Sequence, residues 1–308
     1  MIRPGSRPGS PRIAVVILNY RQPELTLGVL ASLARCEGPP FRVLVRDNGS
    51  GEDDDTVERV RATFPAVHVE AGRENLGVAG GRNAAAKKAL EMWNPKYLLF
   101  LDNDMVVEPA FVAELARPLD EDETIAQTQA KLRYMDDPER INDGGGCRIV
   151  WWRGATEAVG KGEIDRGQYD VAKPCMACCG GAMMVRARVF RELEGFDEAF
   201  NPFGPEDLDF SLRVLEAGHR NLYVPTAVTY HKVMHTGVGG YDETYARNKV
   251  RNWFRLLRRH TTLRQRLGFY LVGGPLAVVQ MVWREARRGN LSAVLGAVRQ
   301  AARVIRSR

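Results

Sequence analysis

Apolar runs alternate with helical patterns through the first hundred residues of the chain. Residues 13–18 form an unbroken run of Ile, Ala, Val and Leu, which is typical of a strand buried on both faces. The patterns together predict strands over 13–18, 41–46, 67–69 and 97–101, and helices over 23–35, 56–64 and 78–92. Strands that alternate with helices predict a mostly parallel, doubly wound α/β sheet.

The rest of the chain is less regular. Residues 131–175 are rich in Gly, and the residues after them predict a strand running into a helix over 182–193, a helix over 207–217, a strand over 221–230 and basic helices from 245 onward. We therefore expect three parts: a disordered leader at 1–11, one globular domain at 12–244 and a helical basic tail at 245–308. The leader lacks the apolar stretch of a signal peptide.

Composition excludes several classes of protein. Hydrophobic residues make up 44% of the chain and charged residues 27%, as in an ordinary soluble globular protein. These values exclude a disordered chain, a collagen-like chain and a multi-span membrane protein. The five cysteines are few and odd in number, which favours a reducing compartment over a disulfide framework.

The net charge of +6 is unevenly distributed. Residues 247–308 hold fifteen Lys and Arg against one acidic residue, Glu285, so this segment is +14 and the preceding residues are −8. An acidic body argues against a nucleic-acid-binding surface spread over the fold. The basic tail instead indicates contact with something anionic, a membrane surface in preference to RNA.

Polar side chains follow the predicted strands where each strand ends. They are Asn19 and Tyr20, Asp47, Asn75, and Asp102-Asn103-Asp104, in the order of the four strands. Ligands bind outside the carboxyl ends of the strands in sheets of this kind, so this edge is the expected site. Two carboxylates two residues apart can reach one Mg²⁺ or Mn²⁺ ion, although a solvated turn explains the same composition.

Two further segments are candidates. Glu206-Asp207 lies where a helix begins, and one carboxylate there is a candidate general base, with helix capping as the alternative explanation. Residues 74–83 lead small side chains into a helix whose N-terminus favours a phosphate, but their spacing is not that of a dinucleotide-binding loop.

These motifs together resemble the family 2 glycosyltransferases, in particular the rhamnosyltransferase-like branch, over about residues 12–240. The matching motifs are Val15 to Tyr20 with Asp47-Asn48-Gly49-Ser50; Asn75-Leu76-Gly77 with Gly80-Gly81-Arg82-Asn83; Asp102-Asn103-Asp104, which looks like the family's DxD; and Gly180-Gly181-Ala182, Gly195-Phe196-Asp197-Glu198 and Glu206-Asp207-Leu208-Asp209-Phe210 with Arg213. Each motif alone is loose, but all of them in this order are specific. The resemblance implies a GT-A fold.

The resemblance also implies roles for individual residues. Asp47 would contact the base or ribose of a nucleotide, in a pocket lined by Asn19 and Tyr20. Asp207 matches the Asp of the family's ED pair, which is the general base of inverting members. The other residues assigned to substrate binding are Asn75, Gly77, Arg82, Asn83, Asp102, Asn103, Gly181 and Glu206.

The implied cofactor is a divalent cation, Mn²⁺ or Mg²⁺, that bridges the donor diphosphate. Asp104 would ligate it, Asp102 would lie near the ribose and is also assigned to the metal, and His231 matches a histidine that completes the metal site in some members. His235 is close enough in sequence that the choice between the two histidines stays open.

The tail has features of a membrane-binding segment. Residues 247–259 predict an amphipathic helix, and residues 267–283 carry no charge. As a straight helix the uncharged stretch would span about 25 Å, short of a ~30 Å hydrocarbon core, and Gly273-Gly274-Pro275 would kink it. A further amphipathic helix is predicted over 290–308. We expect the tail to bind an anionic membrane surface, with packing on the body or in a dimer interface as the alternative.

The resemblance therefore implies a metal-dependent inverting glycosyltransferase of cell-envelope polysaccharide biosynthesis. Its expected partners are a UDP-, dTDP- or GDP-linked sugar donor, a glycan or lipid-linked acceptor and the inner face of the plasma membrane, where it would be cytoplasmic and peripheral. No nucleic acid is expected, and a homo-oligomer stays open.

Two alternatives remain. A sugar-phosphate nucleotidyltransferase would need a Gly-rich basic loop after the first strand, where residues 19–23 provide none. Intact Asp102, Asp104 and Asp207 argue against a catalytically silent sugar-binding or scaffold protein.

Overall fold

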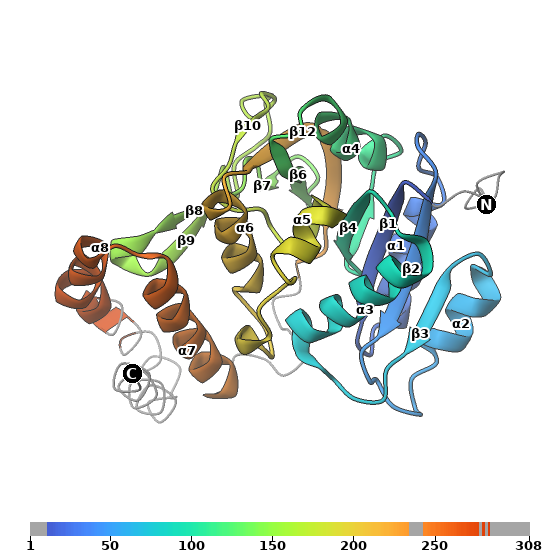
Figure 1. Ribbon diagram of the computed structural model, residues 1–308, viewed down its shortest axis with the longest axis horizontal. Helices are drawn as coiled ribbons and strands as arrows, with labels where there is room; N and C mark the ends of the chain where they lie inside the picture. The colour runs from blue at the N-terminus through green and yellow to red at the C-terminus, as the bar shows by residue number, and fades with distance from the viewer. Residues whose placement is uncertain (1–10, 234–242, 277–278, 281–282, 284–308) are drawn as a thin grey trace. The chain divides into compact units, whose positions relative to one another are not determined.

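The computed structural model describes residues 11–233, 243–276, 279–280 and 283 (Figure 1). The chain divides into two compact units, of which the first comprises 1–147, 158–202 and 206–233 and the second comprises 148–157, 203–205 and 234–308. The predicted leader, except for its last residue, lies outside the described residues, as do His235 and the predicted helix over 290–308.

The first unit is built on one large sheet with helices between its strands. Its strands are β1 (Ile13–Asn19), β2 (Phe41–Asp47), β3 (His68–Ala71), β4 (Tyr97–Asp102), β5 (Met105–Val107), β6 (Ile125–Tyr134), β7 (Ile141–Asp143), β10 (Lys173–Pro174), β11 (Ala182–Arg186) and β12 (Arg220–His231). Its helices are α1 (Pro23–Leu33), α2 (Thr56–Thr63), α3 (Gly77–Trp93), α4 (Phe111–Glu121), α5 (Ala187–Glu192), the 3₁₀ turn η2 (Glu198–Phe200) and α6 (Glu206–Glu216).

The strands are arranged in the order β10-β12-β6-β11-β4-β1-β2-β3, with β5 beside β12 and β7 beside β6. Neighbours among β4, β1, β2 and β3 are parallel, as are β6 and β12, while β11 runs antiparallel between β4 and β6. Asn19 is level with Asp47, and Leu18 is level with Asp102. The carboxyl ends of β2, β1 and β4 therefore meet at one edge, and the predicted mostly parallel α/β sheet is confirmed.

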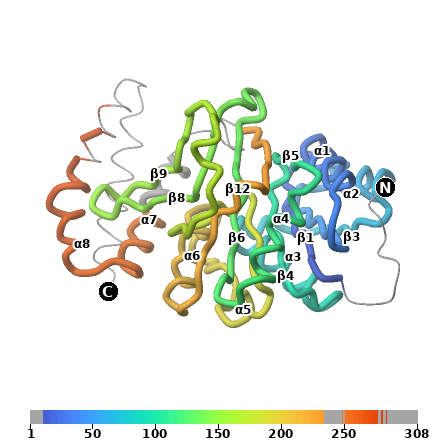
Figure 2. The backbone as a smooth tube through the Cα atoms, turned by 90° about the horizontal axis from the view of Figure 1, so that it is seen from above, coloured from blue at the N-terminus to red at the C-terminus, as the bar shows by residue number. Residues whose placement is uncertain are grey.

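Helices cover both faces of this sheet. Ile13, Val15 and Ile17 of β1 pack in a core with α1, α2 and α4, whereas Ala14 and Val16 pack in a second core with α3, α5 and α6. Seen from above, α1 and α3 lie on opposite sides of β1 (Figure 2). Burial on both faces explains why the strand reads as an unbroken apolar run.

The predicted strands and helices of the first hundred residues are all present, with ends shifted by one or two residues. The sequence pattern predicts no element between 102 and 131, where α4, β5 and most of β6 lie. The strand β6 escapes prediction because it buries polar side chains, Gln127, Thr128 and Gln129, that interrupt its apolar pattern. The irregular segment 131–175 contains the short strands β7 to β10.

The second unit contains the basic helix α7 (Glu243–His260), the helix α8 (Leu263–Gly268) and the π-helical turn η3 (Phe269–Gly273). A hairpin of β8 (Cys147–Val150) and β9 (Ala155–Ala158), joined by the 3₁₀ turn η1 (Trp151–Arg153), belongs largely to this unit. The π turn ends two residues before Pro275, which lacks the amide hydrogen that a regular α-helix requires. Among the described residues, no helix is long and apolar enough to cross a bilayer.

Candidate active site

Asn19 and Asp47 form a buried pair where β1 and β2 end. Asn19 Nδ2 donates to Asp47 Oδ1 over 2.9 Å, and its own Oδ1 accepts from Thr26 Oγ1 over 2.9 Å. Asp47 Oδ2 accepts from the amide of Ser50 over 3.0 Å, which holds the turn after β2. The structure thus joins two predicted donor-binding residues, and Asp47 is fixed as an acceptor for a further hydroxyl or N–H group.

The loop before α3 lies against the same edge. Asn48 Nδ2 donates to Asn75 Oδ1 over 2.9 Å and to the carbonyl of Gly77 over 3.1 Å. Asn75 is therefore held beside the turn after β2. Gly77 has φ +73°, a left-handed conformation that favours glycine, and it opens the helix.

The N-terminal amides of α3 are bonded within the protein. Asn201 Oδ1 accepts from the amides of Ala79 and Gly80 over 3.1 and 3.4 Å, and the carbonyl of Pro202 accepts from Val78 over 2.8 Å. These three amides are thus already engaged at the helix end where the sequence suggested phosphate binding.

Arg82 connects the end of β4 with the beginning of α6. Its buried guanidinium donates to Asp102 Oδ1 over 2.6 Å and to Glu206 Oε1 over 3.0 Å. Burial opposes the charge on Arg82, but Asp102 and Glu206 raise its pKa, so the group stays protonated. The bridge brings the DxD carboxylate and the ED pair to one place.

Asp207 stands next to this bridge. Its Oδ2 accepts from the amide of Gly180 over 2.8 Å, and its Oδ1 accepts from the amide of Leu208 over 2.8 Å. Burial raises the pKa of Asp207, and the charge of Asp102 adds to the rise, while the Gly180 amide and Arg82 oppose it. A half-buried carboxyl group with a raised pKa has the properties required of a general base.

Gly180 lies against Arg82 and Asp207, and Gly181 lies against Asp102. A Cβ atom on Gly180 would lie 2.6 Å from Arg82 Nη1, and one on Gly181 would lie 2.9 Å from Asp102 Oδ2. Only glycine leaves these side chains their present positions, which gives Gly181 a steric role at the site.

Asp104 and His231 form the second polar group at this edge. Asp104 Oδ2 lies 3.3 Å from His231 Nε2, and His231 Nδ1 lies 3.1 Å from Asn142 Oδ1. Burial lowers the pKa of His231, but its contact with Asp104 and the charge of Asp102 outweigh this effect, so the pKa is raised. The structure therefore brings together two of the three predicted metal ligands, while Asp102 is held by Arg82.

These residues suit a divalent cation in part. Asp104 Oδ1 is buried without a hydrogen-bond partner, as expected of an oxygen that has a ligand to accept. Among the described residues, no three His, Cys, Asp or Glu side chains form a ready-made metal site. Asp104 and His231 therefore fit a cation that also takes oxygen ligands from the substrate, as Mg²⁺ usually does in proteins.

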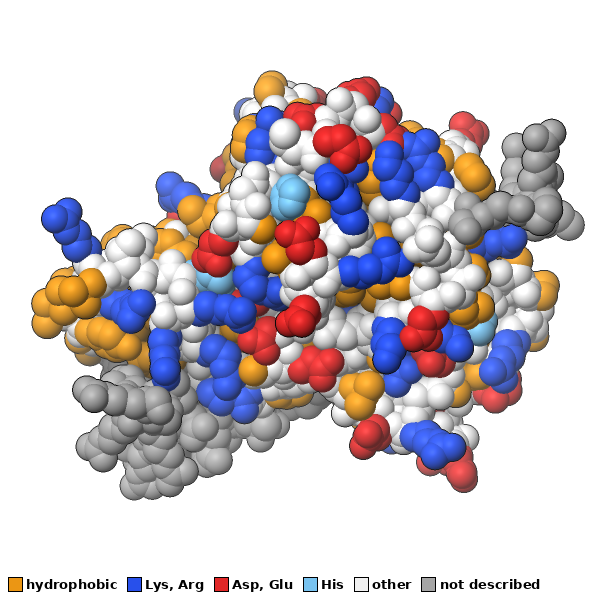
Figure 3. Space-filling model, in the orientation of Figure 1, with side chains coloured by type: hydrophobic (Ala, Val, Ile, Leu, Met, Phe, Trp, Pro, Cys, Tyr) orange, Lys and Arg blue, Asp and Glu red, His pale blue; other side chains and the backbone are white. Residues whose placement is uncertain are grey.

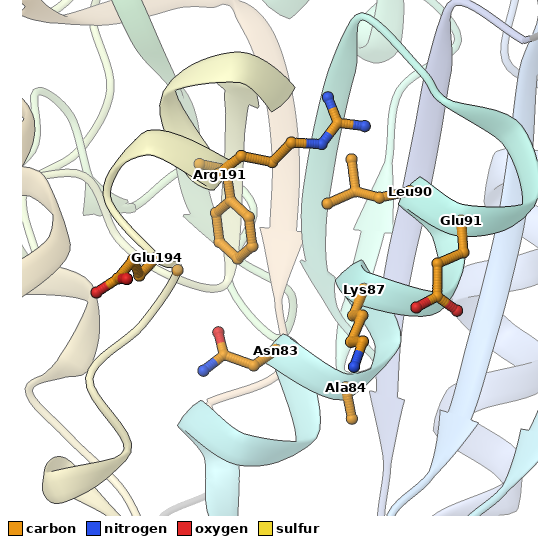
Figure 4. Close-up of a pocket in the computed structure, with 9 residues that line it drawn as sticks. Asn83, Ala84, Lys87, Leu90, Glu91, Arg191 and Glu194 are labelled. Carbon is orange, nitrogen blue, oxygen red and sulfur yellow. The ribbon is translucent and has the colours of Figure 1, made fainter.

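Three of the predicted substrate-binding residues make contacts outside the groups around Arg82 and Asp104. Asn83 Nδ2 donates to the carbonyl of Phe196 over 2.8 Å, and its side chain lines a groove of about 450 Å³ between α3 and α5 (Figure 4). Asn103 is buried and donates to Thr26 Oγ1 over 3.2 Å. Tyr20 is half-buried, with the Arg21 guanidinium 5.7 Å from its ring centre.

Two residues at the site escape sequence reasoning. Asn142 orients His231, and Asn201 caps α3, yet each lies far along the chain from its partner. The only sequence signal for Asn142 is its place beside Asp143 and the Gly run that follows.

Comparison with known proteins identifies the family of this chain. A family model described as glycosyltransferase like family 2 matches residues 11–255 of the chain. The chain belongs to glycosyltransferase family 2. It is accordingly a nucleotide-sugar-dependent glycosyltransferase, as the sequence motifs predict.

Two relatives are similar to most of this chain. It is 26% identical, over 92% of this chain and 98% of the relative, to an N-acetylglucosaminyl-diphospho-decaprenol L-rhamnosyltransferase of Mycobacterium tuberculosis. It is 27% identical to an N-acetylglucosaminyltransferase of Rhizobium sp., over 83% of this chain and 55% of that protein.

Solved structures of glycosyltransferases share the fold. GalNAc-T7, crystallised with UDP, GalNAc and Mn²⁺, has a TM-score of 0.66 at 19% identity, and the match covers 82% of this chain and 48% of that one. The mannosyltransferase PcManGT of Pyrobaculum calidifontis, in complex with GDP-Man and Mn²⁺, has a TM-score of 0.57 at 16% identity, over 96% of this chain and 76% of that one. The predicted GT-A fold of this family member is confirmed.

Proposed function

We propose that the protein transfers a sugar from a nucleoside-diphosphate donor to an acceptor hydroxyl with inversion, and that Asp207 is the general base. The observation that carries the proposal is the Arg82 bridge, because it sets Glu206-Asp207 beside Asp102 at the edge where β1, β2 and β4 end. The predicted donor-binding residues and the candidate base thus lie at one edge of the sheet.

Asp207 has the chemistry that the acceptor side requires. An acceptor hydroxyl is a poor nucleophile until a positioned base takes its proton. The Gly180 and Leu208 amides fix the carboxylate, and its raised pKa makes it a better proton acceptor than an ordinary aspartate. A single displacement by that hydroxyl inverts the anomeric centre.

The donor side is supported by Asp47 and Asn19. Asp47 is buried and keeps acceptor capacity for a ribose hydroxyl or a base N–H group, while Asn19 fixes its orientation. Asp104 and His231 would hold the divalent cation, and crystals of the structural neighbours with Mn²⁺ support such a cofactor. A cation held there would stabilise the negative charge of the departing diphosphate.

The relatives suggest the acceptor and the location. The Mycobacterium tuberculosis relative is named for L-rhamnosyl transfer to a diphospho-decaprenol-linked sugar, so we favour a rhamnosyl or hexosyl donor and a lipid-linked acceptor here. A lipid-linked acceptor, together with the +14 tail, supports a peripheral position on the inner, cytoplasmic face of the plasma membrane.

A calorimetric screen of UDP-, dTDP- and GDP-linked sugars, with and without Mn²⁺, tests the donor class. We expect one nucleotide series to bind, and its affinity to fall when Mn²⁺ is chelated. No binding by any series would contradict the proposal, and binding unchanged by chelation would remove the cation from it.

A further inference from the structure

The β8–β9 hairpin is packed into the helices of the second unit. Gly154, at φ +57°, lies so close to Phe269 that a Cβ atom there would be 2.5 Å from its ring. Gly273 lies against the Trp152 carbonyl, which leaves no room for a Cβ atom. Two segments more than a hundred residues apart in sequence thus form one substructure.

The helical part of this substructure presents apolar side chains to solvent. Leu271 is 74% exposed, and Leu263, Leu267, Tyr270, Val272 and Leu276 of the same segment are also exposed. Residues 263, 267, 270 and 271 follow helical spacing, so they lie on one stripe. Apolar side chains gather over the part of the chain that carries α8, with Lys and Arg beside them (Figure 3). Patches of this kind mark interaction surfaces.

The hairpin adds an aromatic side chain to the same substructure. Trp152 is 47% exposed and carries the Arg153 guanidinium 5.9 Å from its ring centre. Tryptophan and arginine together are typical of the boundary between lipid headgroups and hydrocarbon.

The positive charge of this segment indicates an anionic partner. Residues 247–283 hold eight Lys and Arg and no Asp or Glu, and Arg258, Arg259 and Arg264 are exposed. An apolar stripe flanked only by positive side chains complements an anionic lipid surface, which offers both hydrocarbon and negative headgroups.

We infer that the tip of the β8–β9 hairpin, through Trp152, and the exposed stripe of α8 and η3 together form one docking surface for an anionic bilayer. This inference deepens the membrane location in the proposed function and rests on it. The Trp152 side chain enters the headgroup layer, and Leu271 enters the acyl boundary below it. The middle of the chain therefore contributes to membrane binding alongside the tail.

Vesicle co-sedimentation of the full chain tests this surface. The probes are phosphatidylglycerol-containing vesicles and pure phosphatidylcholine vesicles, and the variants are Trp152→Ser and Leu271→Ser. We expect the unaltered chain to prefer the anionic vesicles, and each substitution to weaken binding about tenfold, as loss of one buried apolar side chain does. Val171→Ser is the matched control, because Val171 is 72% exposed and lies in the first unit.

The outcomes separate the alternatives. If Trp152→Ser binds like the unaltered chain, the hairpin has no part in the surface and the inference is wrong. Equal losses in Val171→Ser would show a nonspecific effect and overturn it too. If vesicle binding is absent while light scattering shows a dimer that Leu271→Ser disrupts, a second copy covers the stripe. Thermal melting confirms folding, and donor binding, measured in parallel, tests the proposed function separately.

Discussion

At the scale of single residues, Asp104 and His231 carry the metal hypothesis. Asp104→Ala removes the buried oxygen that has no protein partner, so we expect Mn²⁺-dependent nucleotide binding to be lost while the melting temperature changes little. His231→Ala should weaken the same binding, and Asn142→Ala should weaken it about 10–100-fold, because Asn142 orients the imidazole.

Calorimetry with Mn²⁺ and nucleotide checks these three variants against His68→Ala, a histidine that packs on Trp93 instead. Unchanged Mn²⁺ dependence in Asp104→Ala would remove the assignment. If His235→Ala weakens binding and His231→Ala does not, the histidine ligand is the other one.

The raised pKa of Asp207 predicts a pH profile. A general base works when it is deprotonated, so kcat/KM should fall as pH decreases through a pKa above that of an ordinary aspartate. The measurement is the pH dependence of kcat/KM at saturating Mn²⁺. An acidic limb in the ordinary aspartate range, or one that persists in the residual activity of Asp207→Asn, would assign it to another group.

At the scale of elements, two glycines in helices predict opposite effects on stability. Gly77 begins α3 at φ +73°, and a Cβ atom there would lie 2.5 Å from Asn201 Oδ1, so Gly77→Ala should destabilise by more than about 1 kcal/mol. Gly28 is exposed within α1 with open space around it, so Gly28→Ala should stabilise by roughly 0.5–1 kcal/mol. Urea unfolding measures both, and the same sign for the two substitutions would contradict this description of the two glycines.

The elements also show how far sequence reasoning reaches. Apolar runs predicted β1, β2 and β4 and placed Asn19, Asp47 and Asp102 at their ends, because burial on both faces leaves an unmistakable pattern. The partners of Arg82 had no such local signal, since Asp102 and Glu206 lie 20 and 124 residues away in sequence. Long-range pairing is decided by the packing of β4, α3 and α6, and it does not appear in the periodicity of any one segment.

At the scale of the whole molecule, the uneven charge predicts separable parts. The site residues Asn19 to His231 lie in the first unit, and the +14 segment lies in the second. A chain cut after Thr244 should therefore bind donor but lose anionic vesicles, since roughly 1 kcal/mol is expected for each basic residue near the surface. Co-sedimentation at low and high salt measures this. Equal sedimentation of cut and full chains would show that the tail packs or oligomerises instead.

The central claim is that Asp207 activates the acceptor for transfer from a nucleotide sugar, and Asp207→Asn tests it most directly. The substitution keeps the shape of the side chain and one acceptor oxygen, which can bond either the Gly180 or the Leu208 amide, so the fold and donor binding should survive. With donor binding measured in parallel, we predict that transfer falls by roughly 10²–10⁴-fold. Transfer at close to the unaltered rate would contradict the account and leave Asp207 with a helix-capping role alone.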